Sequence, residues 1–188
     1  IGGLDLAVEH HFGAELAWCA EIDPAASRVL AARFPHAPNV GDFRHADLEP
    51  VDILCAGFPC QPVSAAGRRA GVQDERWLFD DICDVVGRMA PQPRVLVFEN
   101  VRGLLSANDG DAMARVVQGL ARLGYVGSWR VVRASDVGAP HRRERVFIVA
   151  HADGRGREEL EERDVQQTRR FTAPQRRDAD GLGAPASD

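Results

Sequence analysis

A cysteine held between two prolines is the first residue in this sequence that could do covalent chemistry. Cys60 lies in the stretch GFPCQPVSAAG (57–67), directly after an apolar segment. Pro59 and Pro62 fix the backbone on both sides and remove two hydrogen-bond donors, which favours a stiff, exposed loop. Such a loop suits a nucleophile presented to a substrate. The same local pattern, taken alone, is also that of an inert cysteine in an ordinary turn.

A carboxylate and two arginines could accompany this thiol. Glu99 lies at the end of the apolar run RVLVFEN (94–100). A carboxyl group shielded from water there could protonate or hydrogen-bond a ring nitrogen at neutral pH. Arg143 and Arg145 are two residues apart, so in an extended segment their side chains lie on the same side and could hold an anion or a base carbonyl. Each feature alone is equally typical of a strand end.

Two glycines and several acidic residues could form a second, ligand-binding site. Gly2 and Gly3 come just before a predicted helix, where the lack of side chains would let a ligand approach the backbone. The full GxGxxG dinucleotide pattern is absent. Glu21 and Asp42 each follow a segment with the character of a strand, as Glu99 does.

Alternating strand and helix patterns must position these residues. The periodicity predicts helices over 4–12, 25–34, 77–90 and 111–124, and strands over 15–23, 51–58, 94–100, 127–134 and 145–151. Continuous apolar strands alternating with helices indicate an α/β fold, with a mostly parallel sheet and helices on both faces. Ligands of such sheets bind outside the carboxyl ends of the strands, where the polar residues above are expected.

Composition limits the domain organisation and the class of protein. The chain has 188 residues, a net charge of −5 and 45% hydrophobic residues, enough for one domain. We expect this domain over residues 1–151, and a polar linker or disordered segment over 152–188. Four cysteines without CxxC spacing argue against zinc, so no metal is expected. No apolar run is long enough to span a bilayer and no signal peptide is visible, which predicts a cytoplasmic location without membrane partners.

In their order and spacing, these motifs resemble those of the carbon-5 cytosine DNA methyltransferases. The resemblance covers roughly residues 1–151. It rests on IGGLDLAVE (1–9), AEID (20–23), GDF (41–43), DILCAGFPCQPVSAAG (52–67), ENV (99–101) and HRRERVFIVA (141–150). Family membership implies a Rossmann-like fold that uses S-adenosylmethionine as methyl donor. Because the chain begins with Ile and lacks the family's target-recognition region and last two motifs, we expect an incomplete piece of such an enzyme.

The resemblance also implies roles for individual residues. Cys60 would be the nucleophile and Glu99 the catalytic acid, with Arg143 and Arg145 holding the base and the loop. The donor would contact a set of residues from several motifs: Gly2, Gly3, Leu4, Glu21, Ile22, Asp42, Phe43, Gly57, Pro59 and Leu78. Gln61, Ser64 and Asn100 would serve the DNA or the loop. His141 stands where the family usually has Gln, which could alter local hydrogen bonding.

This resemblance implies methylation of carbon 5 of a flipped-out cytosine through a covalent Cys60 adduct. Double-stranded DNA is then the expected partner of a monomeric enzyme, and a restriction endonuclease acting on the same site is a further candidate partner. Three alternatives stay open: the same chemistry on cytosine in transfer RNA, a catalytically silent fragment that only binds donor or nucleic acid, and a nicotinamide-binding oxidoreductase. The last does not explain PCQ, ENV and RRER together.

Overall fold

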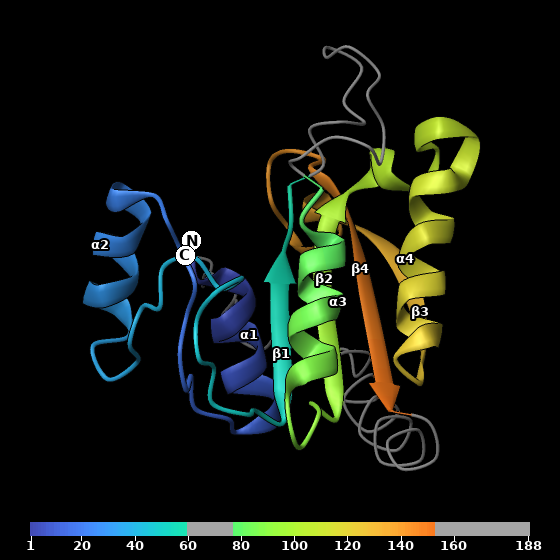
Figure 1. Ribbon diagram of the computed structural model, residues 1–188. Coiled ribbons are helices and arrows are strands. Elements are labelled where there is room, and N and C mark those ends of the chain that lie inside the picture. The colour runs from blue at the N-terminus through green and yellow to red at the C-terminus, as the bar shows by residue number, and fades with distance from the viewer. Residues whose placement is uncertain (60–76, 153–188) are drawn as a thin grey trace, which may run out of the picture. The chain divides into compact units, whose positions relative to one another are not determined.

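The computed structural model describes residues 1–59 and 77–152 (Figure 1). In chain order its helices and strands are α1 (Gly3–Phe12), α2 (Pro24–Arg33), β1 (Ile53–Gly57), α3 (Phe79–Arg88), β2 (Val95–Val101), α4 (Asp111–Arg122), β3 (Tyr125–Arg133) and β4 (Glu144–Ala152). Short 3₁₀ helices cover Arg102–Leu105, Ala107–Gly110 and Ala134–Val137. None of the helices described here has the length and apolar character required to cross a bilayer.

The four strands form one mixed sheet in the order β1-β2-β4-β3. The predicted α/β class is confirmed, but the expectation of a mostly parallel sheet is wrong for the described strands. β1 and β2 pair in parallel, whereas β4 pairs antiparallel with both β2 and β3. Only the ten residues 134–143 connect β3 to β4, too few for the crossover that parallel neighbours need, so β4 returns beside β3 in the opposite direction.

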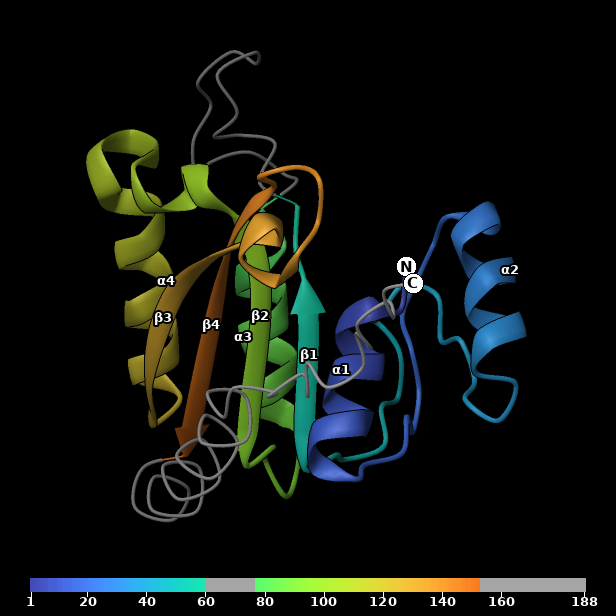
Figure 2. The same cartoon turned by 180° about the vertical axis from the view of Figure 1, so that it is seen from behind.

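Helices α3 and α4 cover one face of this sheet (Figures 1 and 2). Their periodic apolar residues form the core with inward-facing residues of the strands. The core members are Leu54 of β1, Leu96 and Phe98 of β2, Val146, Ile148 and Ala150 of β4, Phe79, Ile82, Val85 and Val86 of α3, and Ala112, Met113, Val116 and Leu120 of α4. Alternate residues of β4 face this core, which leaves Arg145 and Phe147 for the opposite face of the sheet.

In the first fifty residues both predicted helices form, as α1 and α2, but the predicted strand does not. The segment 15–23, predicted as a strand, forms only an isolated bridge between Cys19 and Asn39, because no described strand flanks it to continue a ladder. Helix α2 packs Leu30 and Phe34 into a small second cluster with Ala37. Helix α1 lies beside β1 but buries none of its residues fully, although it has the predicted length.

Candidate active site

The strand register brings three predicted site residues to one edge of the sheet. Gly57, the last residue of β1, is paired with Glu99 on β2. Val101, the last residue of β2, is paired with Arg145 near the start of β4. The carboxyl ends of β1 and β2 therefore meet the beginning of β4 at the same edge, at the top of Figure 1. This is the edge where ligands of α/β sheets bind.

Glu99 and Arg145 form an ion pair at this edge. Arg145 Nε lies 2.8 Å from Glu99 Oε1, and the two side chains are 24% and 29% exposed. The same guanidinium also donates a hydrogen bond of 2.9 Å from Nη1 to the backbone carbonyl of Glu144. On the neighbouring strand, a Cβ placed on Gly57 would lie 3.6 Å from Glu99 Oε2, so Gly57 leaves room beside the carboxylate. The arrangement presents a carboxyl group and a fixed cation together.

Asn100 ties β2 to the backbone that leads into the proline-flanked cysteine. Its side chain is 3% exposed, and Nδ2 donates to the carbonyl of Phe58 over 3.1 Å. Its Oδ1 accepts from the backbone N–H of Val101 over 2.8 Å, so both ends of the amide are used. Asn100 therefore fixes the chain one residue before Pro59, which is itself exposed. The other predicted residues of this loop, Cys60, Gln61 and Ser64, lie outside the described residues.

An aromatic cluster supports the same backbone. The rings of Phe58, Trp77, Phe79 and Phe98 lie 5.4–6.2 Å apart in edge-to-face and tilted contacts. Phe58 and Trp77 stand close to the two ends of the interval 60–76, and their ring centroids are 5.7 Å apart. Trp77 is buried, and its indole Nε1 has no hydrogen-bond partner among the described residues. Aromatic packing thus holds together the two points at which the described chain breaks off and resumes.

The acidic segment around Glu21 is positioned by an asparagine that the sequence analysis missed. Asn39 Oδ1 accepts from the Glu21 N–H over 3.0 Å, and Asn39 Nδ2 donates to the Glu21 carbonyl over 3.0 Å. Asn39 Oδ1 also accepts from the N–H of Gly41, which links the segment to the one that carries Asp42. Asp23 caps helix α2 through a 2.7 Å bond from the Ala26 N–H. In the sequence, the only indication of this role of Asn39 was its position just before the motif GDF (41–43).

Three of the residues predicted to contact the donor have distinctive surroundings. Ile22 is 76% exposed, an uncommon exposure for so large an apolar side chain next to a carboxylate. Asp42 is held by Arg44 at 2.6 Å, and the hydrogen bonds from Arg44 lower the pKa of Asp42 to about 2. A Cβ on Gly3 would meet no atom within 4 Å, so the backbone there is open to a ligand.

Four further residues of the predicted donor set are placed less distinctly. Leu4 on α1 and Leu78 directly before α3 are half-buried. Phe43 is half-buried and packs against the main core. Gly2 takes a left-handed conformation with φ 70°, and a Cβ there would lie 2.7 Å from the Phe34 ring, so only glycine fits. No described contact joins Leu4, Leu78 or Phe43 to the Glu99–Arg145 pair.

Arg143 does not join Arg145 as the sequence spacing suggested. β4 begins at Glu144, and Arg143 precedes it with a positive φ of 31°. Two residues share a side only when both are extended, so this expectation is wrong. Arg143 and His141 are both exposed. The spacing argument failed because the extended backbone of β4 begins at Glu144 and does not include Arg143.

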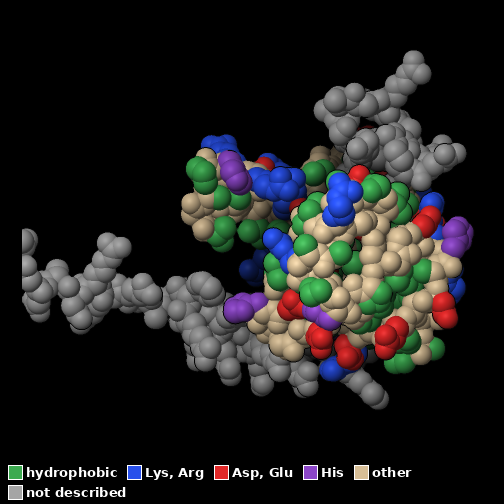
Figure 3. Space-filling model, turned by 90° about the vertical axis from the view of Figure 1, so that its left-hand side faces the viewer, with side chains coloured by type: hydrophobic (Ala, Val, Ile, Leu, Met, Phe, Trp, Pro, Cys, Tyr) green, Lys and Arg blue, Asp and Glu red, His purple; other side chains and the backbone are tan. Residues whose placement is uncertain are grey.

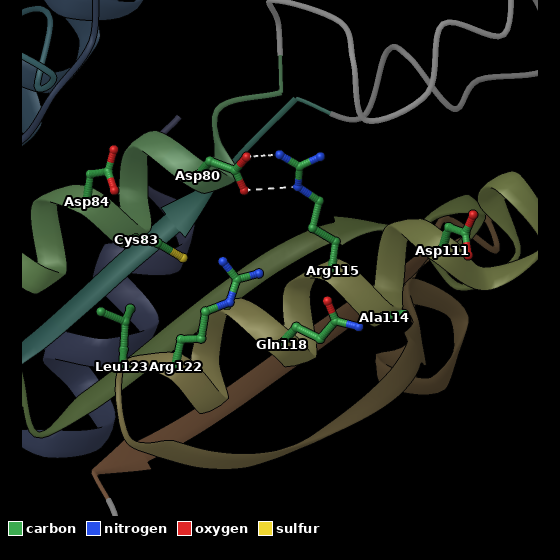
Figure 4. A pocket seen from close by; sticks show the side chains of 10 residues that line it. Asp80, Cys83, Asp84, Asp111, Ala114, Arg115, Gln118, Arg122 and Leu123 are labelled. Carbon is green, nitrogen blue, oxygen red and sulfur yellow. Dashed lines mark hydrogen bonds and ion pairs between the residues drawn. The ribbon is translucent and has the colours of Figure 1, made fainter.

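A hollow of about 670 Å³ lies between α3 and α4, away from these residues (Figure 4). It is lined by side chains of both signs, among which Asp80 and Arg115 form an ion pair. None of its lining residues belongs to the predicted site. Burial raises the pKa of the Cys83 thiol in this hollow to about 11, and burial raises the pKa of Cys55 to about 12. Residues 1–59 and 77–152 hold no cluster of three metal-ligating side chains.

Comparisons with known proteins agree with this architecture. The family model described as C-5 cytosine-specific DNA methylase matches residues 1–181. The Type II methyltransferase M.DsaV of Dactylococcopsis salina is 36% identical over 157 residues, which cover 81% of this chain and 44% of that protein. The Type II methyltransferase M.HhaI of Haemophilus parahaemolyticus is 35% identical over 79% of this chain and 46% of its own length. The chain spans about half the length of these relatives.

Solved structures give the same fold at lower identity. The Dnmt2 methyltransferase of S. pombe matches with a TM-score of 0.63 and 19% identity, over 82% of this chain and 49% of that one. A Dnmt2 variant from Spodoptera frugiperda matches with a TM-score of 0.63 and 21% identity, over 82% and 48%. At these identities the likeness establishes the fold, and it confirms the predicted Rossmann-like α/β class.

Proposed function

Because the chain belongs to the C-5 cytosine-specific DNA methylase family, we propose that its protein transfers a methyl group from S-adenosylmethionine to carbon 5 of cytosine in DNA. The observation that carries this proposal is the Glu99–Arg145 ion pair at the end of β2. It lies beside the end of β1, from which the backbone runs through Phe58 and Pro59 to the proposed nucleophile. An acid, a cation and a thiol would then face one substrate.

The proposed mechanism makes carbon 5 nucleophilic by covalent addition. The Cys60 thiolate attacks carbon 6 of the cytosine ring, and a bond forms between Sγ and that carbon. Glu99 hydrogen-bonds or protonates ring nitrogen 3 and so offsets the charge that develops there. Carbon 5 then takes the methyl group from the donor sulfur, which leaves as the thioether S-adenosylhomocysteine. A base removes the carbon-5 proton, the electron pair of that bond restores the ring double bond, and the Cys60 thiolate departs from carbon 6. Arg145 would hold the cytosine carbonyl while its contact with Glu99 keeps the carboxylate in place.

The donor, when bound, supplies a methyl group on a positively charged sulfur. Glu21 would accept hydrogen bonds from its ribose hydroxyls, and Ile22 would pack against its adenine. Asp42 would accept from the adenine amine, with Phe43 beside it. The open backbone at Gly2, Gly3 and Leu4 would lie against the rest of the donor, together with Gly57, Pro59 and Leu78.

A cytosine inside a duplex hides its ring carbons, so the target base must leave the helix. We propose that Gln61 and Ser64, on the loop after Cys60, contact the DNA or fill the gap, and that Arg143 contacts the same region. The Type II names of the relatives support a partnership with a restriction endonuclease that acts on the same site. A monomeric state and a cytoplasmic location remain predictions from the sequence.

Transfer of a tritiated methyl group tests this function and separates it from the RNA alternative. Full-length protein is incubated with labelled S-adenosylmethionine and, in separate reactions, duplex DNA or transfer RNA. We expect label in DNA, released as 5-methylcytosine on hydrolysis, and none above background in RNA. Label in RNA alone would assign the chemistry to the other substrate. Label in neither would contradict the proposal.

A further inference from the structure

Glu144, at the start of β4, connects three elements at the edge of the sheet that carries the proposed site. Its Oε1 lies 2.8 Å from Nε of Arg133, the last residue of β3. Its Oε2 lies 3.0 Å from Nη1 of Arg102, which follows the end of β2. Its backbone carbonyl accepts the hydrogen bond from Arg145. One residue therefore sets the positions of three arginines.

The two arginines on the Glu144 carboxylate keep most of their hydrogen-bonding capacity. A guanidinium has five N–H donors in a rigid fork, and the described contacts use one donor of Arg102 and one of Arg133. The Arg102 and Arg133 side chains are 64% and 54% exposed, whereas that of Glu144 is only 23% exposed. Hydrogen bonds from Arg133 and Arg102 lower the pKa of Glu144, so the carboxylate stays ionised at neutral pH. Within residues 1–59 and 77–152, no hydrogen-bond acceptor is described for the remaining donors, which the contact with Glu144 orients.

The local charge is opposite in sign to that of the whole chain. Residues 99–102 and 133–145 contain five arginines and three acidic residues, whereas the chain carries a net charge of −5. Figure 3 shows the side of the molecule on which α2 lies, where basic and acidic side chains are both visible. The excess of arginine in these two segments gives the ends of β2 and β3 and the start of β4 a local positive charge.

We propose that Arg102 and Arg133, oriented by Glu144, bind a backbone phosphate of duplex DNA beside the nucleotide whose base enters the Glu99–Arg145 site. This inference rests on the proposed function. Guanidinium forks match phosphate oxygens in pairs, and a positioned pair binds a phosphate with less loss of side-chain entropy than two free arginines. Glu144 would act as a positioning residue, because it touches the arginines and not the DNA.

The strand register places the two arginines next to the proposed base contact. β4 lies between β2 and β3, and neighbouring strands are about 4.8 Å apart, so the backbones of Arg102 and Arg133 approach within about 10 Å of each other across β4. Glu144 and Arg145 are consecutive, which ties the arginine pair to the proposed base contact. A flipped nucleotide remains joined to its phosphates, so a base at Glu99 brings phosphate groups to this edge.

Salt dependence of DNA binding by the full-length protein tests the proposal. Each lost phosphate contact reduces the slope of log K against log salt by about 0.9. Because both arginines bind the same phosphate, the variant Arg102→Gln/Arg133→Gln should lower the slope by about 0.9, and weaken binding at 0.1 M salt by up to about 8-fold if binding at 1 M salt is unchanged. The matched control Arg28→Gln/Arg122→Gln makes the same change of charge on α2 and α4 and should alter neither quantity comparably.

The variant Glu144→Gln separates a positioning role from a simple effect of charge, because the two predict opposite changes in DNA affinity. Removal of a negative charge near a polyanion should strengthen binding if Glu144 only screens the arginines. If Glu144 orients them, affinity should fall several-fold while the salt slope stays the same, because both arginines remain. Tighter binding by Glu144→Gln would overturn the positioning role.

Equal slopes for wild type and the Arg102/Arg133 double variant would overturn the phosphate contact, even when methyl transfer to DNA by the wild type confirms the proposed function. Failure of the wild type to bind or methylate DNA would instead overturn the proposed function and this inference with it. Circular dichroism melting of each variant shows whether it is folded before binding is compared.

Discussion

At the scale of single residues, the proposed chemistry depends on groups that hold the reacting side chains in place. Arg145 fixes Glu99, and Asn100 fixes the backbone at Phe58. The sequence motifs identified Glu99, Asn100 and Arg145, because each stands at a strand end within a short pattern. The resemblance implied that Asn100 serves the loop, but its hydrogen bond to the Phe58 carbonyl could not be predicted from local spacing, since it joins residues 42 positions apart.

Asn100→Asp should destabilise the fold and reduce methyl transfer. The buried Nδ2 donor would be replaced by an oxygen facing the Phe58 carbonyl, and an unmet hydrogen bond at a buried site costs about 1–3 kcal/mol. The control Asn108→Asp changes an exposed asparagine in a left-handed turn that aspartate also tolerates. Urea unfolding measures both. Equal stability of the two variants would show that the Asn100 bond contributes nothing.

The thiols of Cys55 and Cys83 should resist alkylation at neutral pH. Only the thiolate reacts, and a pKa raised to about 12 leaves about one Cys55 thiol in 10⁴ ionised at pH 8. The rate should rise with pH until the pKa is reached, with Cys83, whose pKa is raised to about 11, reacting before Cys55. Iodoacetamide labelling read by peptide mass spectrometry checks this order. Rapid labelling of Cys55 at pH 7 would contradict it.

At the scale of elements, close packing of α3 on α4 supports the sheet that carries the site. Gly119 of α4 faces α3, where a Cβ would lie 2.8 Å from Cε1 of Phe79 and 3.1 Å from Sγ of Cys83. Gly3 at the start of α1 has the opposite environment, with no atom within 4 Å of a Cβ. The two glycines therefore serve different purposes, one for helix packing and one for access to the backbone.

Gly119→Ala should lower the stability of the protein, whereas Gly3→Ala should leave it unchanged or raise it. Overpacking at Gly119 costs about 1–3 kcal/mol, of which the better helix propensity of alanine recovers up to about 1 kcal/mol. Gly3→Ala meets no neighbour and should leave stability unchanged or raised by up to about 1 kcal/mol. Thermal unfolding measures both, and calorimetry should show weaker donor binding for Gly3→Ala. If Gly119→Ala were as stable as the wild type, Gly119 would not be a point of close contact between α3 and α4.

Elements were predictable where their signal was local. The helices and strands after residue 50 begin and end within about three residues of their predicted bounds. The segment 15–23 and the direction of β4 were predicted wrongly, because strand pairing depends on neighbours that periodicity does not reveal. Asn39 was missed for the same reason, since it joins the Glu21 and Asp42 segments through side-chain bonds.

At the scale of the whole molecule, this chain spans about half the length of its relatives. The proposed site draws its acid and its cation, Glu99 and Arg145, from the sheet edge. The predicted boundary between residues 1–151 and 152–188 remains a prediction. Calorimetric titration of the donor into residues 1–188, followed by a methyl-transfer assay, distinguishes a silent binding fragment from an active enzyme. We expect poor or absent activity from residues 1–188, and measurable turnover by these residues would contradict that expectation.

The central claim is that Cys60 attacks cytosine in DNA with the help of Glu99. It is tested most directly by covalent trapping of full-length protein on duplex DNA with 5-fluorocytosine at the target position, in the presence of S-adenosylmethionine. Release of the enzyme requires loss of a proton from carbon 5, and fluorine at that position blocks this step. The covalent adduct therefore persists and survives denaturing electrophoresis. We predict a trapped complex for the wild type and none for Cys60→Ala. A trapped complex formed equally by Cys60→Ala would contradict the account.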